Sequence, residues 1–106
     1  MHIVKKTFPV GRYTYLVDTT LAAYELANLE KLGIEEIRYF YGTAPYEGDG
    51  KLLALKEGLW YLHDMGHCSC YDATDGINLI KGYIGFNELL DKCSDELRKD
   101  VEFLIN

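Results

Sequence analysis

Residues 59–71, LWYLHDMGHCSCY, begin as a hydrophobic strand and end as a tight loop rich in imidazole and sulfur. They hold the only Trp of the chain, two of its three His and two of its three Cys. Alternation along a strand places Leu59, Tyr61 and His63 on one side and Trp60, Leu62 and Asp64 on the other. Gly66 then ends the strand, so this segment predicts a strand that leads into a chemically distinctive bend.

The sequence before this segment predicts its strand partners. Residues 51–56 and 59–63 form a hairpin joined at Glu57-Gly58, a pair typical of a tight turn. Residues 36–42 predict a further strand, with Ile37, Tyr39 and Tyr41 on one face and Arg38 and Phe40 on the other. The turn-rich residues 45–50 end that strand. Residues 12–18 alternate in the same way and predict the first strand of the sheet.

Helical spacing appears twice. Residues 21–32 place apolar side chains on one face and Glu25, Asn28 and Lys31 on a solvated face, with Thr19 or Thr20 as the cap and Gly33 as the stop. Residues 86–104 repeat apolar side chains at helical spacing, which favours two short helices with a bend near Ser94 and with Asn87 as a cap. Residues 77–84 predict a weak strand or an irregular return.

These elements predict an α+β fold in a single domain, residues 1–106. The fold is a small antiparallel sheet of about four strands, with one helix after the first strand and a helical C-terminal tail.

Composition narrows the function classes. The net charge of −6 argues against a protein that binds nucleic acid directly, because phosphate contacts need clustered Lys and Arg. No apolar run approaches the roughly 20 residues of a membrane span, and the start of the chain has no apolar signal region. The expected location is therefore the cytoplasm, where three cysteines stay as free thiols.

A zinc site is the first chemical hypothesis for the loop. His63, His67, Cys68 and Cys70 are zinc-ligand types in acidic surroundings, and Cys93 is a further thiol. The Cys-x-Cys spacing lacks the pairwise rhythm of zinc fingers, and Cys93 falls on the apolar stripe of the tail. The preferred interpretation is a tight turn that binds no cofactor, with zinc as the alternative.

A catalytic thiol is a weaker hypothesis. His63 is the better geometric base for a nucleophilic Cys68, but nearby carboxylates disfavour the thiolate. Residues 72–76 have a glycine at the wrong position for an EF-hand, and residues 46–50 lack the helix start of a phosphate loop. The prediction is that the protein is not an enzyme.

A protein-binding surface remains. The chain has nine Tyr, and exposed aromatic residues are the usual anchors of protein interfaces. The predicted contact face combines these with the acidic segments on either side of the hairpin: Tyr46, Glu47, Asp49, Glu57, Trp60, Asp64, Asp72 and Asp75.

Residues 46–50, YEGDG, the following hairpin and residues 67–71, HCSCY, resemble segments of small uncharacterised phage and prophage proteins. The resemblance covers residues 46–71 and ends at Tyr71, where the usual Gly and Trp-bearing continuation is absent. It implies a viral origin and carries no catalytic residues.

Together these observations predict a phage-type accessory protein that binds and inhibits a host protein in the host cytoplasm. The most specific form of the hypothesis is an inhibitor of a CRISPR–Cas-like defence system, whose basic nucleic-acid channel would attract an acidic surface. A homo-oligomer is also compatible with so small a chain.

Overall fold

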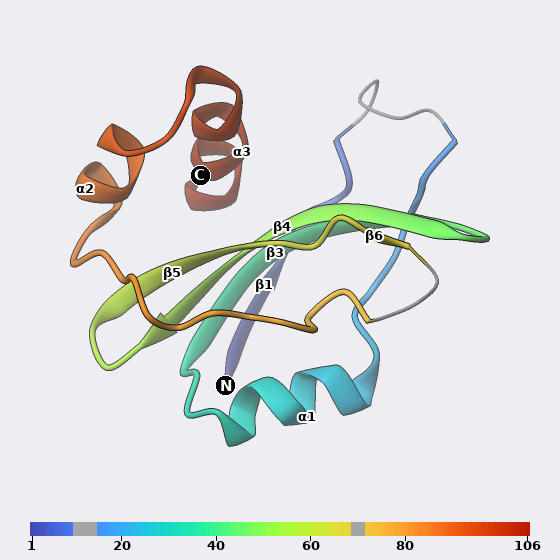
Figure 1. Ribbon diagram of the computed structural model, residues 1–106, viewed down its shortest axis with the longest axis horizontal. Coiled ribbons are helices and arrows are strands. Elements are labelled where there is room, and N and C mark those ends of the chain that lie inside the picture. The colour runs from blue at the N-terminus through green and yellow to red at the C-terminus, as the bar shows by residue number, and fades with distance from the viewer. Residues whose placement is uncertain (10–14, 69–71) are drawn as a thin grey trace.

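The computed structural model describes residues 1–9, 15–68 and 72–106, and for His67 and Cys68 it describes the backbone alone (Figure 1). A sheet of short and long strands is combined with three helices in this part of the chain. In chain order the elements are β1 (His2–Lys5), β2 (Val17–Asp18), α1 (Ala23–Lys31), β3 (Glu36–Ala44), β4 (Glu47–Lys56), β5 (Leu59–Asp64), β6 (His67–Cys68), α2 (Phe86–Asp91) and α3 (Asp95–Ile105).

The sheet has the order β1-β3-β4-β5, with β2 paired to β3 and β6 paired to β4. This confirms the predicted α+β class. The sheet is mixed, however, because β1 runs parallel to β3 while the other strand pairs are antiparallel. The sequence interpretation missed β1, whose four residues are too few to show an alternating pattern.

The predicted first strand, residues 12–18, is shorter in its described part, because Tyr15 and Leu16 are not strand residues. Only Val17–Asp18 pair with β3, and residues 10–14 lie outside the described residues. Asp18 explains part of this local arrangement, since its carboxylate accepts the Phe8 N–H at 2.8 Å and binds the Lys5 ammonium at 2.7 Å. A polar tether therefore holds this segment against β1, rather than a long strand ladder.

Alternation along β3 sorts the core into two layers, as the sequence predicts. Ile37, Tyr39 and Tyr41 belong to the layer that packs against α1, whereas Phe40 belongs to the layer that packs against the C-terminal helices. Figure 1 shows α1 on one side of the sheet and α2 and α3 on the other. Both faces of β3 and β4 are therefore covered over the middle of the sheet.

Helix α1 lies within the predicted residues 21–32 and ends before Gly33, whose φ of 86° is the expected left-handed stop. The predicted cap is wrong: Ala22 occupies the N-cap position and makes no side-chain cap bond. The Thr19 hydroxyl instead bonds to the Val17 carbonyl and to the Thr43 hydroxyl. Thr19 therefore fastens β2 to β3.

Strands β3 and β4 form a long hairpin with a two-residue turn at Pro45 and Tyr46. The turn-rich residues 45–50 do end β3, but only the first two form the turn, because Glu47–Gly50 belong to β4. Glycine is required at position 50, since a Cβ there would overlap the Phe40 carbonyl and approach the Met65 side chain. The predicted β4–β5 turn at Glu57-Gly58 is confirmed, with φ values of 52° and 80°.

Residues 77–84 form the irregular return, attached to β5 by a bridge between Trp60 and Tyr83. The predicted bend at Ser94 is confirmed, because the Ser94 hydroxyl caps α3 by accepting the Leu97 N–H. Asn87 is not a cap: Gly85 holds the N-cap position of α2. Among the described residues, no helix has both the length and the apolar character that crossing a membrane requires.

Candidate functional site

The free end of the β3–β4 hairpin presents two tyrosines beside a carboxylate. Tyr46 in the turn is 78% exposed, and Glu47 follows it at the start of β4. The Tyr15 hydroxyl donates to Glu47 Oε2 at 3.3 Å, and the Tyr15 side chain is 54% exposed. Two exposed aromatic side chains therefore lie next to one negative charge.

Two further carboxylates lie on the same face of the sheet. Glu47, Asp49 and Lys51 alternate along β4, and Asp64 on β5 pairs with Lys51. Asp49 and Asp64 each have an oxygen within 4 Å of the point where a Cβ on Gly66 would lie. We call Tyr15, Tyr46, Glu47, Asp49 and Asp64 the hairpin-end surface.

The charge of Asp64 is stabilised locally. Partial burial acts to raise the pKa of Asp64, but the Gly66 N–H at 2.9 Å and the Lys51 ammonium at 3.2 Å outweigh it and hold that pKa below 3.8. Asp64 is therefore an anion at neutral pH.

The other predicted contact residues lie elsewhere. Glu57 is in the β4–β5 turn, at the opposite end of β4 from Glu47, and the Trp60 ring packs on Phe86 with centroids 4.8 Å apart. Asp72 and Asp75 belong to the turn beside α1, on the other face of the sheet. The predicted residues therefore do not form one continuous face, and only Tyr46, Glu47, Asp49 and Asp64 are brought together.

The carboxylates beside α1 have structural partners. Glu25 was expected on a solvated face, but it is only 6% exposed and accepts the Thr74 N–H at 3.1 Å and the Thr74 hydroxyl at 2.9 Å. Asp75 accepts the Asp72 N–H at 2.8 Å. A hydrogen bond to Asp72 raises the pKa of Tyr24 to about 12. These hydrogen bonds join α1 to residues 72–76.

His63, the described imidazole of the proposed metal set, is also engaged. Its Nε2 lies 2.9 Å from the Ala73 carbonyl oxygen, so Nε2 carries the proton and donates. A metal ion could therefore use only Nδ1 while this bond persists. The side chains of His67 and Cys68, and all of Cys70, lie outside the described residues.

Within the described residues, no group of three His, Cys, Asp or Glu side chains is arranged to hold a metal. Cys93 takes part in the apolar layer under the C-terminal helices, as its place on the apolar stripe predicts. Its thiol donates to the Leu89 carbonyl at 3.2 Å, and burial raises its pKa despite the opposing charge of Arg98. Cys93 is therefore a packed thiol.

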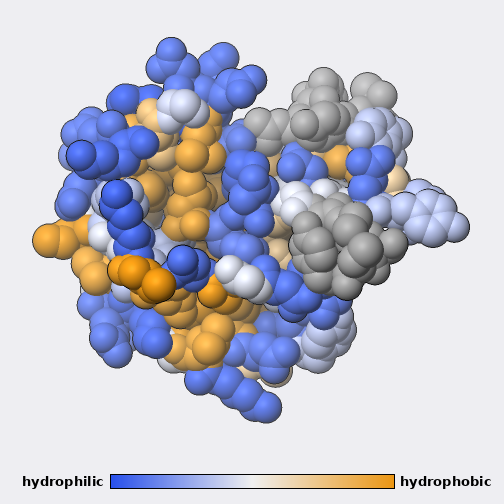
Figure 2. All heavy atoms as spheres, in the orientation of Figure 1, coloured by the Kyte–Doolittle hydropathy of each residue, from blue (hydrophilic) through white to orange (hydrophobic). Residues whose placement is uncertain are grey.

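A groove lies on a different part of the molecule, between β5, the irregular return and the C-terminal helices. It has a volume of about 340 Å³. Sequence reasoning missed it; the available signal was Ile80, an apolar residue in the irregular return that belongs to no predicted apolar face, and Ile80 lines the groove. Figure 2 shows hydrophobic residues gathered on the side of the molecule that carries β5 and these helices.

Comparison of the chain with protein-family models, with curated proteins and with solved structures finds no significant match. The geometry of the chain itself is therefore the basis for a functional proposal.

Proposed function

We propose that the protein acts by binding another protein through the hairpin-end surface and that it is not an enzyme. The observation that carries this proposal is the 78% exposure of Tyr46 at the tip of a hairpin, directly beside Glu47. An aromatic ring in solvent costs free energy that a partner can recover by burying it, and Tyr is among the residues that dominate binding energy. Tyr15 supplies a second such ring next to the same carboxylate.

The partner that suits this surface is basic. Glu47, Asp49 and Asp64 add local negative charge to a chain whose net charge is already −6. Opposite charge on a partner would speed the encounter and select against acidic proteins. With the phage resemblance, this supports an accessory protein that occupies the basic nucleic-acid channel of a host defence protein, in the host cytoplasm, and thereby inhibits it.

The test compares the full-length protein with two variants. The first is Tyr46→Ser/Glu47→Gln, which removes a ring and a charge from the hairpin tip without touching the core. The second is Glu88→Gln, a matched control that removes one exposed charge from α2. Each protein is immobilised, exposed to lysate of the bacterial host, and the retained proteins are quantified by mass spectrometry.

We expect one basic protein at near-stoichiometric amount on the unmodified chain and on the control, and its loss from the hairpin-tip variant. The purified partner should then release nucleic acid as the unmodified protein is added. Equal retention by both variants, or the absence of any stoichiometric partner, contradicts the proposal.

A further inference from the structure

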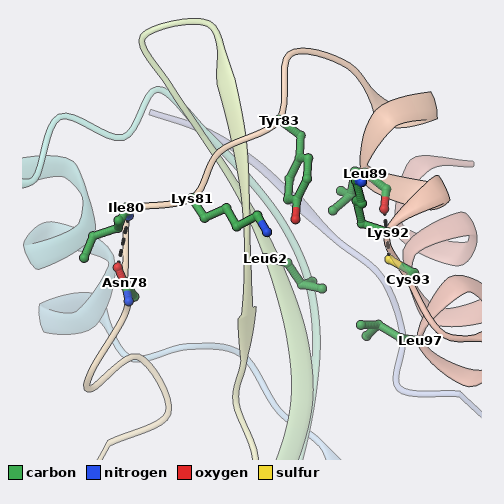
Figure 3. Close-up of a pocket in the computed structure, with 9 residues that line it drawn as sticks. All are labelled: Leu62, Asn78, Ile80, Lys81, Tyr83, Leu89, Lys92, Cys93 and Leu97. Carbon is green, nitrogen blue, oxygen red and sulfur yellow. Dashed lines mark hydrogen bonds between the residues drawn. The ribbon is translucent and has the colours of Figure 1, made fainter.

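The groove lies where residues 77–84 diverge from the edge of β5. Residues 77–84 bridge to β5 at Tyr83 but not further along. The Asn78 side chain accepts the Ile80 N–H at 3.0 Å, and this local turn competes with a continued strand ladder. Figure 3 shows Asn78, Lys81 and Tyr83 along this return, with the Lys81 and Tyr83 side chains pointing toward Leu62 of β5 and with Leu89, Cys93 and Leu97 beyond.

The direction of the Leu62 N–H and C=O groups follows from the bridge between Trp60 and Tyr83. The Trp60 N–H donates to the Tyr83 carbonyl at 2.8 Å, and the Trp60 carbonyl accepts the Tyr83 N–H at 2.9 Å. Trp60 therefore directs both groups away from β4. In an antiparallel strand the direction alternates, so Leu62, two residues on, also directs its N–H and C=O outward.

These two groups have no hydrogen-bond partner among residues 1–9, 15–68 and 72–106. They lie beside the groove, because Leu62 is one of its lining residues. An outward N–H and C=O at an exposed sheet edge are the elements that an added strand uses.

The remaining lining defines which strand would fit. Leu62 and Leu97 are half-buried and supply apolar surface, whereas Leu89 is buried. The Cys93 thiol already donates a hydrogen bond to the Leu89 carbonyl. Lys81 and Lys92 are exposed, and the nine lining residues described include no carboxylate. The groove is thus apolar and positively charged, in contrast to the acidic chain as a whole.

We propose that this groove binds an extended segment of a partner protein, which adds a strand to β5 at Leu62 and carries alternating apolar and acidic side chains. Its backbone would bond to the N–H and C=O of Leu62. Its apolar side chains would cover Leu62 and Leu97, and its carboxylates would meet Lys81 and Lys92. Alternation suits this lining because successive side chains of a strand point to opposite faces.

The probe is a synthetic peptide, acetyl-Thr-Val-Asp-Val-Asp-Val-Thr-amide, titrated into the full-length ¹⁵N-labelled protein. A second peptide has the same side chains but N-methyl groups on alternate backbone nitrogens, which block strand pairing and leave charge intact. The protein variants are Lys81→Glu/Lys92→Glu and the matched control Lys99→Glu, an exposed lysine of α3 that does not line the groove.

We expect the first peptide to slow hydrogen exchange of the Leu62 amide and the methylated peptide to have no effect. Reversal of both lysines should weaken binding about tenfold, the scale of two exposed ion pairs turned repulsive, while Lys99→Glu leaves it unchanged. The proposal is overturned by any of three results. These are equal binding of the methylated peptide, binding without protection of Leu62, and no binding at about 1 mM peptide, the weak limit of specific recognition.

Discussion

Glu25 is a buried carboxylate on α1 that accepts two hydrogen bonds from Thr74. Its position on α1 places it among polar side chains, and the helical pattern alone assigns it to solvent. The turn at residues 72–76 instead folds back over α1, and Thr74 donates two hydrogen bonds to one oxygen of Glu25. A carboxylate that is only 6% exposed with two donors is a tether between segments far apart in sequence.

A double-mutant cycle tests this tether. We expect Thr74→Val to lower the free energy of unfolding by about 1 kcal/mol, because one bond to a charged group is lost. Glu25→Ala should lower it by about 2 kcal/mol, since the Thr74 N–H also loses its acceptor. The double variant should cost at least about 0.5 kcal/mol less than the sum, as measured by urea unfolding. Asn28→Ala on the exposed side of α1 is the control, and full additivity would contradict the tether.

The pKa of Asp18 determines how the free energy of unfolding should change at low pH. The Lys5 ammonium holds the pKa of Asp18 below 3.8, and the Phe8 N–H acts in the same direction against partial burial. A folded-state pKa below the unfolded value adds stability that is present above that value and is lost as pH falls through the folded pKa. We therefore expect the free energy of unfolding to decrease once the pH falls below 3.8.

The variant Asp18→Asn isolates this contribution. It should make the acid branch of the stability profile shallower and cost no more than about 1 kcal/mol at neutral pH, because the pair is partly solvated. Urea unfolding between pH 2.5 and 7 measures both. An unchanged acid branch would show that the ion pair contributes nothing to folding.

His63 offers a test of the zinc alternative. Its bond to the Ala73 carbonyl gives the imidazole a structural role, so His63→Phe should destabilise the fold by about 1 kcal/mol. Elemental analysis of protein purified without chelators should give less than about a tenth of an equivalent of zinc, since structural sites bind zinc tightly enough to be filled on purification. One equivalent of zinc, lost in Cys70→Ser, would replace this interpretation with a metal-binding module.

At the scale of elements, the β4–β5 turn is the most completely encoded. Glu57 and Gly58 both adopt positive φ, which is the geometry of a type I′ turn that matches strand twist. Glycine adopts it freely, whereas glutamate does not. Gly58 therefore suits the turn, whereas Glu57 is strained in it.

Substitutions at this turn should act in opposite directions. Gly58→Ala should lower the free energy of unfolding by about 1 kcal/mol, because a Cβ disfavours positive φ. Glu57→Asn should raise it by about 0.5 kcal/mol, since asparagine tolerates that region. Gly76→Ala is the matched comparison, because its φ is 73° and a Cβ there meets nothing within 4 Å, so it should cost about as much as Gly58→Ala. No loss of stability at position 58, or a loss there with none at position 76, would contradict this account.

The elements that the sequence predicts are those with local signals. Alternation along β3, the glycine stop of α1 and the Ser94 cap each depend on neighbouring residues, and each is confirmed. Strand β1 and residues 47–50 of β4 depend on distant partners. A parallel neighbour leaves no hairpin signal, and Gly50 suits a strand only because Phe40 lies against it.

At the scale of the whole molecule, the sequence likewise predicts the parts of the candidate sites that depend on neighbouring residues and misses the parts that depend on distant ones. The acidic residues are close in sequence, but β4 separates Glu47 from Glu57 by about 30 Å at 3.3 Å per residue, and the sheet separates Asp64 from Asp72. Alternation along β4 places Glu47 and Asp49 on one face. Pairing of β5 with β4 adds Asp64, and Tyr46 lies in the adjoining turn. The groove at Leu62 depends on where the return leaves β5, which no local pattern encodes.

The two proposed interfaces should be independent at physiological salt and coupled at low salt. Glu47 and Leu53, the strand partner of Leu62, are six positions apart on β4, or about 20 Å. The screening length is about 8 Å at 0.15 M ionic strength and about 30 Å at 0.01 M. The negative hairpin tip and the lysines of the groove therefore affect each other's ligands only when salt is low.

The measurement is the affinity of the alternating peptide for Tyr46→Ser/Glu47→Gln at both salt concentrations. At 0.15 M we expect the same affinity as for the unmodified chain, within about 0.3 kcal/mol, the additivity seen for distant sites. At 0.01 M the variant should bind the acidic peptide more tightly, because a repulsive charge has been removed. Tighter binding at both concentrations would mean that the hairpin tip contacts the groove's ligand directly, and the two surfaces would then be parts of one interface.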